Sequence, residues 1–125
     1  MTLRVALVVP DRELWSGQAS IVIAKTVEGD IGVQTGHSPV FGVLAEGSTV
    51  EIVPEDAPRV KAAVSGGFLS VADDQVSILA AGAQLGEEVD TTAARQEIDS
   101  GVAEAGEDTP AVRYARARLR AAGQV

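Results

Sequence analysis

One glycine-rich segment, residues 29–39, places the residues of a possible acid–base pair side by side. Its sequence, GDIGVQTGHSP, sets His37 next to Ser38. A histidine that activates a serine hydroxyl needs a third group to orient it, and none is visible in the sequence. Adjacent residues of an extended segment also point in opposite directions. The segment therefore predicts a contact loop that presents His37, and a small hydrolase is the weakest interpretation.

Two other motifs could bind ligands, and both favour a structural role. Gly66 and Gly67 lack the helix and the lysine that follow a phosphate-binding glycine loop, so a bulge or tight hairpin is favoured. The acidic pairs at 73–74 and 87–88 lack the alternating oxygen ligands of a calcium loop. The chain has no cysteine and one histidine, which excludes thiolate and multi-histidine sites. We predict no catalytic residues, no metal site and no cofactor.

Arginines near the end of the chain follow a helical spacing. Arg113, Arg116 and Arg120 recur three and four residues apart, which places them on one face of a helix that holds no acid. Guanidinium groups suit carboxylate recognition. The pattern predicts either an acidic protein partner or a solvated face that complements the negative end of the helix dipole. The charges alone do not decide between them.

The charge of the chain is unevenly placed. Residues 109–125 carry +4, whereas residues 1–108 hold 6 bases and 18 acids, for a total of −8 over 125 residues. Four arginines beside so acidic a body do not form the basic surface that nucleic acid requires. No apolar run approaches the roughly 20 residues that cross a bilayer, and no signal peptide opens the chain. We expect a cytoplasmic protein without bilayer insertion.

Short runs of valine, isoleucine and leucine dominate the chain to about residue 85. Turn signals separate the runs at intervals typical of a β-sandwich or barrel. The predicted strands are residues 3–9, 20–26, 31–34, 40–44, 49–53, 59–65, 68–72 and 76–80. We expect an aliphatic core with Trp15, Phe41 and Phe68 as its few bulky anchors.

The hydrophobic period changes to that of a helix after residue 86. Asp90 can cap a helix over about 91–105, which Gly106 ends, and Thr109 with Pro110 begins a second helix over about 110–122. Thin alanine stripes give such a hairpin little stability of its own. The fold class is therefore α+β: an N-terminal antiparallel β-sandwich, or flattened barrel, over residues 1–85, and a movable or partner-dependent C-terminal αα-hairpin over 86–125.

The order of several short motifs resembles a known family, the epsilon subunits of F-type ATP synthases. The motifs are GDIGV at 29–33, GHSP at 36–39, GGFLSV at 66–71 and VSIL at 76–79, followed by the hairpin. The resemblance covers essentially the whole chain. The segment ARARLR at 115–120 is similar to actinobacterial members.

The resemblance implies a non-catalytic rotor subunit at the cytoplasmic face of the plasma membrane, which couples proton flow to ATP synthesis. In the family the β-sandwich contacts the gamma subunit and the c-subunit ring. This implies a contact loop that includes Asp30, Gly36, His37 and Pro39. The hairpin can extend toward the catalytic alpha and beta subunits and obstruct ATP hydrolysis. Residues Arg113, Arg116 and Arg120 are then the candidates for contact with an acidic segment of beta.

A regulatory nucleotide site found in some members is not expected here. Their motif has an arginine at the position that Ala93 occupies, and Arg95 lies about 200° around the helix from it. A nucleotide-sensing module and a stand-alone β-sandwich adaptor for an acidic protein remain the alternatives from other classes.

Overall fold

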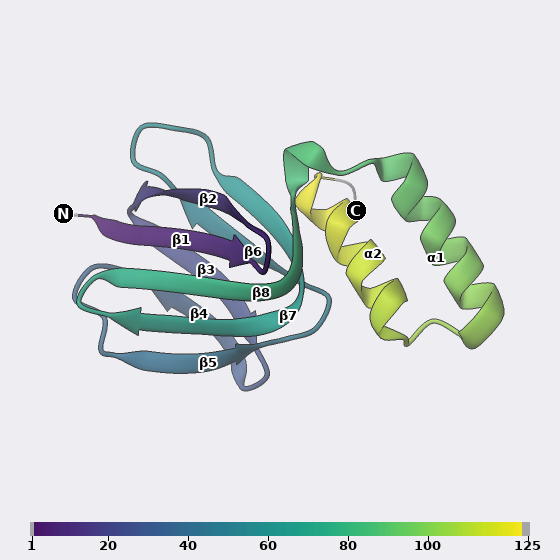
Figure 1. Cartoon of the computed structure of the whole chain (residues 1–125), viewed down its shortest axis with the longest axis horizontal. Helices are drawn as coiled ribbons and strands as arrows, with labels where there is room; N and C mark the ends of the chain where they lie inside the picture. Colours follow the sequence, from purple (N-terminus) through teal and green to yellow (C-terminus); the bar gives the residue numbers. More distant parts are fainter. Residues whose placement is uncertain (1, 124–125) are drawn as a thin grey trace.

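Two parts of the chain lie side by side in the computed structural model, which describes residues 2–123. The strands form one part and a pair of helices the other (Figure 1). The ends of the two predicted domains, residue 1 and residues 124–125, lie outside the described residues. Within residues 2–123, no helix is long and apolar enough to span a membrane.

Eight strands form the β part. Their bounds are β1 Leu3–Val9, β2 Arg12–Ala19, β3 Ile21–Thr26, β4 Gly29–Val33, β5 Val40–Leu44, β6 Ser48–Val53, β7 Val60–Ala72 and β8 Gln75–Leu85. The strand order is β2-β1-β8-β7-β5-β3-β4, and β6 pairs with both β3 and β7. Among the described strands the pairs are antiparallel, except that β1 and β8 are parallel.

Strand β7 joins the two layers of the sandwich. Its first half, to Val64, pairs with β6, and its second half, from Gly67, pairs with β5. The register with β8 shifts at Gly66 and Gly67, where the expected bulge lies. A Cβ atom at Gly67 would lie 2.0 Å from the carbonyl oxygen of Leu79, so this close approach requires glycine.

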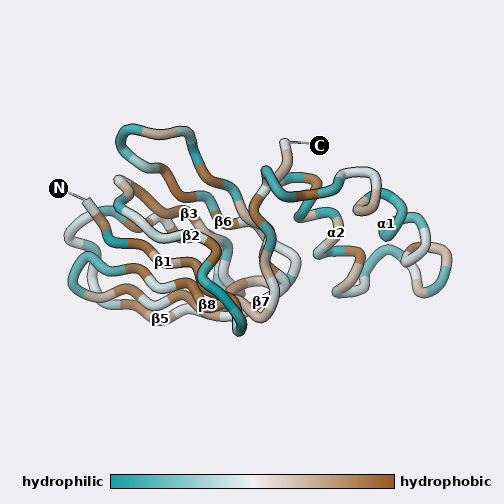
Figure 2. The backbone as a smooth tube through the Cα atoms, turned by 45° about the horizontal axis from the view of Figure 1, so that its top comes forward, coloured by the Kyte–Doolittle hydropathy of each residue, from teal (hydrophilic) through white to brown (hydrophobic). Residues whose placement is uncertain are grey.

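The core between the layers is aliphatic, as its sequence predicted. Strand β1 shows the cause, because alternate residues from Leu3 to Val9 are buried. Strand β6 shows the same alternation, and the hydropathy colours place most of the brown, hydrophobic segments on the strands (Figure 2). The largest fully buried side chains are Leu3, Leu7, Leu44, Ile52, Leu69 and Ile78.

Three expectations about the strands and core are wrong. Strand β2 was not predicted, because its exposed sequence RELWSGQA lacks a clear apolar alternation. Strand β7 is one strand where two were expected, since the glycine pair bends it without ending it. Phe41 and Phe68 lie outside the core with 65% and 44% exposure, whereas Trp15 is partly buried against it.

The helices follow a short 3₁₀ turn, η1 Gly86–Glu88. Helix α1 Thr91–Ala105 begins at Asp90, whose side chain accepts a hydrogen bond from the Ala93 amide at 3.0 Å. Helix α2 Pro110–Ala121 begins with Thr109 as its cap, which accepts from the Val112 amide at 3.2 Å. Both N-caps agree with the sequence prediction, because these side chains satisfy amides that have no partner within the helix.

Helix α2 lies between the β part and α1 (Figure 1). Its Ala117 and Ala121 are buried against Ala63 of β7. On the other side of α2, Val112 lies so close to Gly101 of α1 that a Cβ atom there would be 2.7 Å from it. The hairpin therefore obtains burial from the β part that its own alanine stripes do not supply.

Candidate functional site

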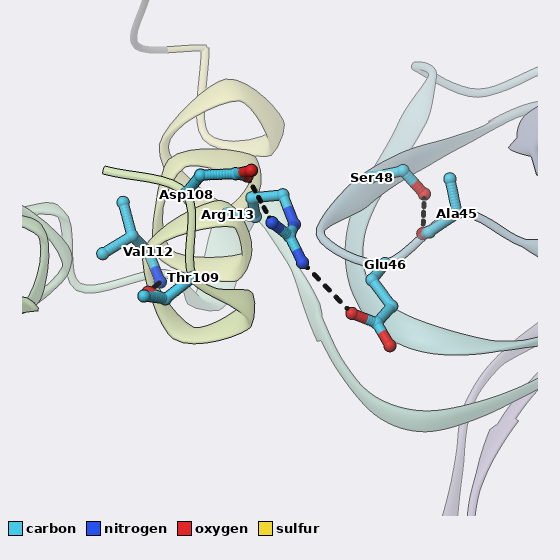
Figure 3. Close-up of polar contacts among 7 residues, drawn as sticks. All are labelled: Ala45, Glu46, Ser48, Asp108, Thr109, Val112 and Arg113. Atoms are coloured by element: carbon cyan, nitrogen blue, oxygen red, sulfur yellow. Dashed lines mark hydrogen bonds and ion pairs between the residues drawn. The ribbon is translucent and has the colours of Figure 1, made fainter. Parts of the chain in front are cut away.

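An arginine of α2 connects the hairpin to the β part. The Arg113 guanidinium donates to Asp108, which precedes the helix, and to Glu46 on the β5–β6 turn at 3.3 Å (Figure 3). Ser48 stabilises this turn by donating to the Ala45 carbonyl at 2.7 Å. The hydrogen bond to Asp108 and, with it, the negative charge of both carboxylates raise the pKa of Arg113. Both side chains of the Glu46 contact are exposed, so solvent screening makes it a weak interaction.

A second arginine of α2 contacts the same turn through backbone. Arg120 Nη2 donates to the Gly47 carbonyl at 3.1 Å. Gly47 has a φ of +66° and lies directly beneath the helix, since a Cβ atom there would be 2.6 Å from the Arg113 carbonyl carbon. The turn residues Glu46 and Gly47 and the two arginines thus form one docking seat for α2.

The remaining arginines of α2 pair with acids of the hairpin. Arg116 lies 3.7 Å from Glu107 in the α1–α2 loop, and Arg118 donates to Glu97 of α1. Arg118 also stacks over Tyr114 at 5.0 Å from the ring centroid. Partial burial lowers the pKa of Arg118 and raises the pKa of Tyr114. The helix holds no acid of its own, but within residues 2–123 neighbouring segments supply carboxylates to Arg113, Arg116 and Arg118.

A second glycine shapes the other end of the seat. A Cβ atom at Gly86 would lie 2.1 Å from the Ala121 carbonyl oxygen. Only glycine lets the helix approach the β part this closely at both Gly47 and Gly86. The contact itself is made by Ala63, Ala117 and Ala121, with Tyr114 packed beside them. Small side chains allow close approach but bury little area.

The loop after β4 is anchored to a neighbouring turn. The Gly36 amide donates to the Asp74 carboxylate at 2.7 Å, and His37 Nδ1 lies 2.7 Å from the Ser38 carbonyl oxygen. Asp73 and Asp74 form the β7–β8 turn with positive φ angles of 52° and 59°. The structure brings Gly36, His37 and Pro39 together in this one exposed or half-exposed loop.

Asp30 lies apart from that loop. It is near the start of β4, opposite Lys25 of β3, whereas His37 follows the other end of the strand. The length of β4 therefore separates Asp30 from His37. The four predicted contact residues form two sites at opposite ends of one strand.

An exposed apolar patch covers the outer face of β5, β7 and β8. The rings of Phe41 and Phe68 lie 5.4 Å apart, and Val43 and Leu79 pair with Phe68 across the neighbouring strands. Each of these four side chains is at least 44% exposed. A hollow of about 430 Å³ adjoins the patch between Pro10, Phe68 and Leu79. Contiguous apolar surface of this kind marks a protein interface.

The start of α1 was the candidate nucleotide position. The Asp90 carboxylate is engaged in capping, and Ala93 supplies a methyl group where the motif has an arginine. Arg95 is exposed further along the helix. Within residues 2–123, no group of three or more His, Asp or Glu side chains could hold a metal ion.

Several residues of the docking seat were missed by sequence reasoning. No contact with α2 was predicted for Glu46, Gly47 or Asp108. Their proximity to α2 depends on how the helix packs, which the local sequence does not specify. The glycines at positions 47 and 86 could have indicated a helix contact, because glycine permits a helix to approach closely.

Comparison with known proteins identifies the class to which this fold belongs. Residues 2–86 match the family described as ATP synthase, Delta/Epsilon chain, beta-sandwich domain. Relatives named ATP synthase epsilon chain occur in Thermobifida fusca (51% identical, covering 96% of this chain and 91% of the relative) and Rhodococcus opacus (48% identical, 95% and 94%). The Streptomyces coelicolor relative is 48% identical, with 96% and 94% covered. The chain belongs to the ATP synthase epsilon-chain family.

Solved structures share the fold. A chain of the Euglena gracilis mitochondrial ATP synthase, in a structure of OSCP, F1 and c-ring, has a TM-score of 0.73 at 23% identity, with 94% of this chain and 75% of that chain covered. A chain from the central stalk and c-ring of the Tetrahymena thermophila mitochondrial ATP synthase has a TM-score of 0.59 at 20% identity, with 98% and 91% covered. These similarities establish the β-sandwich followed by two helices. The relatives above are from actinobacteria, in agreement with the sequence prediction.

Proposed function

We propose that this chain is a non-catalytic central-stalk subunit of a proton-translocating ATP synthase. It couples rotation of the gamma subunit and c-ring to ATP synthesis, and its C-terminal helices restrain ATP hydrolysis. The complex holds it peripherally at the cytoplasmic face of the plasma membrane. Family membership over nearly the whole chain supports the assignment.

The exposed patch of Phe41, Val43, Phe68 and Leu79 is the observation that carries this proposal. Two neighbouring aromatic rings exposed to water favour binding of a partner at this face, because each ring becomes buried on association. The patch lies on a rigid sheet rather than on the hairpin. It fits a permanent contact with gamma, while the helices remain available for regulation.

Contact with the c-ring is assigned to the loop of Gly36, His37 and Pro39 and to Asp30. The Asp74 anchor holds the loop in one conformation, which reduces the entropy lost on binding. Asp30 would make a separate polar contact at the other end of β4. The tail arginines Arg113, Arg116 and Arg120 are assigned to an acidic segment of the beta subunits when the hairpin leaves its seat.

Purification of the tagged chain from solubilised membranes of its source tests the assignment. Recovery of gamma with alpha, beta and c subunits is expected. The change Phe41→Ser should reduce recovery of all of them, whereas Val27→Ser, at an equally exposed site on the β3–β4 turn, is the matched control. Recovery of an acidic protein without these subunits would favour a stand-alone adaptor.

Two activity measurements test the finer roles. Asp30→Arg or His37→Asp should lower proton-driven ATP synthesis, and unchanged synthesis would remove the c-ring assignment. Deletion of residues 109–125 should raise ATP hydrolysis by the assembled complex. A rate equal to that of the wild type would leave the arginines as a solvated surface.

A further inference from the structure

Strand β4 is an edge strand, because among the described strands it pairs with β3 alone. Two hydrogen bonds show which way the backbone groups of β3 point. The Val27 amide donates to the Val43 carbonyl at 2.9 Å. The Lys25 carbonyl accepts from the Ala45 amide, also at 2.9 Å. The backbone groups of residues 25 and 27 therefore point toward β5, and those of the alternate residues of β3 point toward β4.

This alternation leaves backbone groups of β4 directed at the free edge. The alternate residues of β3 lie opposite Gly29, Ile31 and Val33. The amide and carbonyl groups of Asp30 and Gly32 therefore point away from β3, to a side where no described strand pairs. An edge of this kind can accept an extended segment of another protein as an additional strand.

Gly32 differs from the other glycines of the chain, which has 13. Eight have a positive φ angle, and at four others a Cβ atom would lie 3.3 Å or less from a neighbouring atom. Gly32 has no positive φ angle, and a Cβ atom there would meet only Ile21 Cδ1, at the ordinary contact distance of 3.9 Å. The register with β3 continues through Gly32 without a bulge. Within residues 2–123, neither the backbone nor the packing requires glycine at this position.

The missing side chain at Gly32 leaves apolar neighbours partly uncovered. Gly32 lies opposite Ile23, and Ile21 lies beside it on the same outer face. Both isoleucines are half-buried, whereas the alternate residues Val22 and Ala24 point into the core. Glycine within a strand often marks a site where another backbone approaches closely, and an aromatic side chain on the neighbouring strand can cover such a glycine. An aromatic ring of a partner placed opposite Gly32 would also cover Ile23.

Asp30 gives this edge a charge. It lies two residues before Gly32, so the two residues face the same side of the sheet. Its side chain is exposed, and within residues 2–123 it takes part in no hydrogen bond or ion pair, although Lys25 lies opposite it on β3. A basic side chain on an added strand would therefore find a free carboxylate here.

We propose that the edge of β4 accepts an extended segment of a neighbouring subunit as an added strand, with an aromatic side chain opposite Gly32 and a basic side chain opposite Asp30. This inference rests on the proposed function and names the chemistry of the contact at Asp30. Asp30 and the loop that holds His37 lie at opposite ends of β4. A segment that runs along the edge would join these two contacts into one interface.

The change Gly32→Val tests this inference, because it should affect the free chain and the complex in opposite directions. Valine suits a strand better than glycine, and its Cβ atom meets no clash. The melting temperature of the isolated full chain should therefore rise by roughly 2 to 4 °C. In the complex the valine occupies the space of the partner's ring. The variant should therefore assemble less well than the wild type.

Competition between the two chains measures assembly. Wild type and variant are produced together in cells of the source, and the ATP synthase is purified through a tag on its beta subunit. Mass spectrometry then gives the ratio of variant to wild type in the complex, relative to their ratio in the cell. This relative ratio should be about one to ten for Gly32→Val. The control Ser16→Val adds the same side chain at an exposed position of the other edge strand, β2, and should give a ratio near one.

Two further measurements test the charge and the backbone. Asp30→Asn should also assemble less well, whereas Glu28→Gln, which removes the same charge from the adjoining turn, should assemble like the wild type. The amides of Asp30 and Gly32 should exchange hydrogen at least about tenfold more slowly in the purified complex than in the free chain, because the added strand accepts their hydrogen bonds.

Four results would overturn the inference. A lower melting temperature of Gly32→Val would show that the fold itself needs this glycine. Assembly of Gly32→Val equal to that of Ser16→Val would show that the gap is not used. Equal assembly of Asp30→Asn and Glu28→Gln would remove the basic partner residue, and unchanged exchange of the two edge amides would remove the added strand. The proposed function fails separately, if the purified ATP synthase contains neither the wild-type chain nor the variant.

Discussion

Alanine at position 47 should release helix α2 while the β-sandwich stays folded. The Cβ atom would lie 2.6 Å from backbone and Cβ atoms of Arg113, so the helix must retreat by roughly 1 Å to reach an ordinary contact distance. Neither group is a flexible side-chain end that can rotate away. The retreat removes the close contact on which the small alanine interface depends.

The free energy of docking sets the size of the effect. The methyl groups of Ala63, Ala117 and Ala121 contribute roughly 2 kcal/mol at about 0.8 kcal/mol per buried carbon. The exposed ion pair between Arg113 and Glu46 adds little to this, because solvent screens it. Docking is therefore stabilised by about 2 to 3 kcal/mol. Its loss should speed amide exchange in α2 by roughly thirtyfold to a hundredfold.

A matched control separates this clash from backbone strain. Alanine also strains the backbone at Gly47, where φ is +66°, by about 1 kcal/mol. Gly36 has a φ of +83°, but a Cβ atom there would meet nothing within 4 Å. Gly36→Ala should therefore lower the melting temperature through strain alone and leave α2 exchange unchanged.

Hydrogen exchange followed by mass spectrometry, with Trp15 fluorescence as a second signal, distinguishes the two variants. Trp15 packs against the main core and also lines a hollow with Gly86 and Ala121, so its emission should change on release of α2 in Gly47→Ala and stay unchanged in Gly36→Ala. Equal exchange rates in α2 of Gly47→Ala and Gly36→Ala would refute the argument that the seat depends on close approach at Gly47.

Three further outcomes are expected. Asp90→Ala should destabilise α1 by about 1 kcal/mol through loss of its cap, seen as lower helical circular dichroism, whereas Asp90→Asn should be nearly neutral. Gly101→Val should separate the two helices at Val112 and speed exchange in α1, although valine is compatible with a helix; unchanged exchange would contradict the close packing. Burial raises the pKa of Tyr114 in the folded state. The stabilisation that the neutral Tyr114 side chain contributes is therefore complete below pH 10 and is lost as the pH rises through the folded-state pKa. Tyr114→Phe should reduce the loss of amide-exchange protection in α2 at alkaline pH.

The sequence predicted elements well where a local rule dominates. The helix caps at Asp90 and Thr109 and the aliphatic alternation of β1 each follow from short-range chemistry. Strand β2 could not be predicted in this way, because it is an edge strand with half of its residues exposed and only one buried. Pairing with β1 rather than apolar patterning makes it a strand.

The placement of the aromatic rings shows a second limit. Strand β5 reads VFGVL, which is apolar on both faces, so the pattern does not reveal which face is buried. We expected Phe41 in the core because aromatic residues usually fill cores, and this expectation assigned the wrong face of β5 to the interior. Leu44 lies inside, and Phe41 and Val43 lie outside. The patch that most strongly indicates a partner was therefore not predicted.

The candidate site was predicted by residue but not by geometry. The arginine spacing correctly placed Arg113, Arg116 and Arg120 on one helix, yet it could not show that their partners differ. Those partners are Glu46, Glu107 and the Gly47 carbonyl, which are distant in sequence or are backbone groups. Whether the three arginines contact a beta subunit remains a prediction.

The parallel pair of β1 and β8 determines when this protein can fold during its synthesis. Leu7 and Ile78 are cross-strand partners about 70 residues apart, with the first strand of the sandwich paired to the last. The ribosome must therefore release β8 before β1 has its second neighbour, and until then one hydrogen-bonding edge of β1 remains unpaired in the nascent chain. The seat at Gly86 follows directly after β8, so the hairpin emerges onto a sandwich whose strands are already complete.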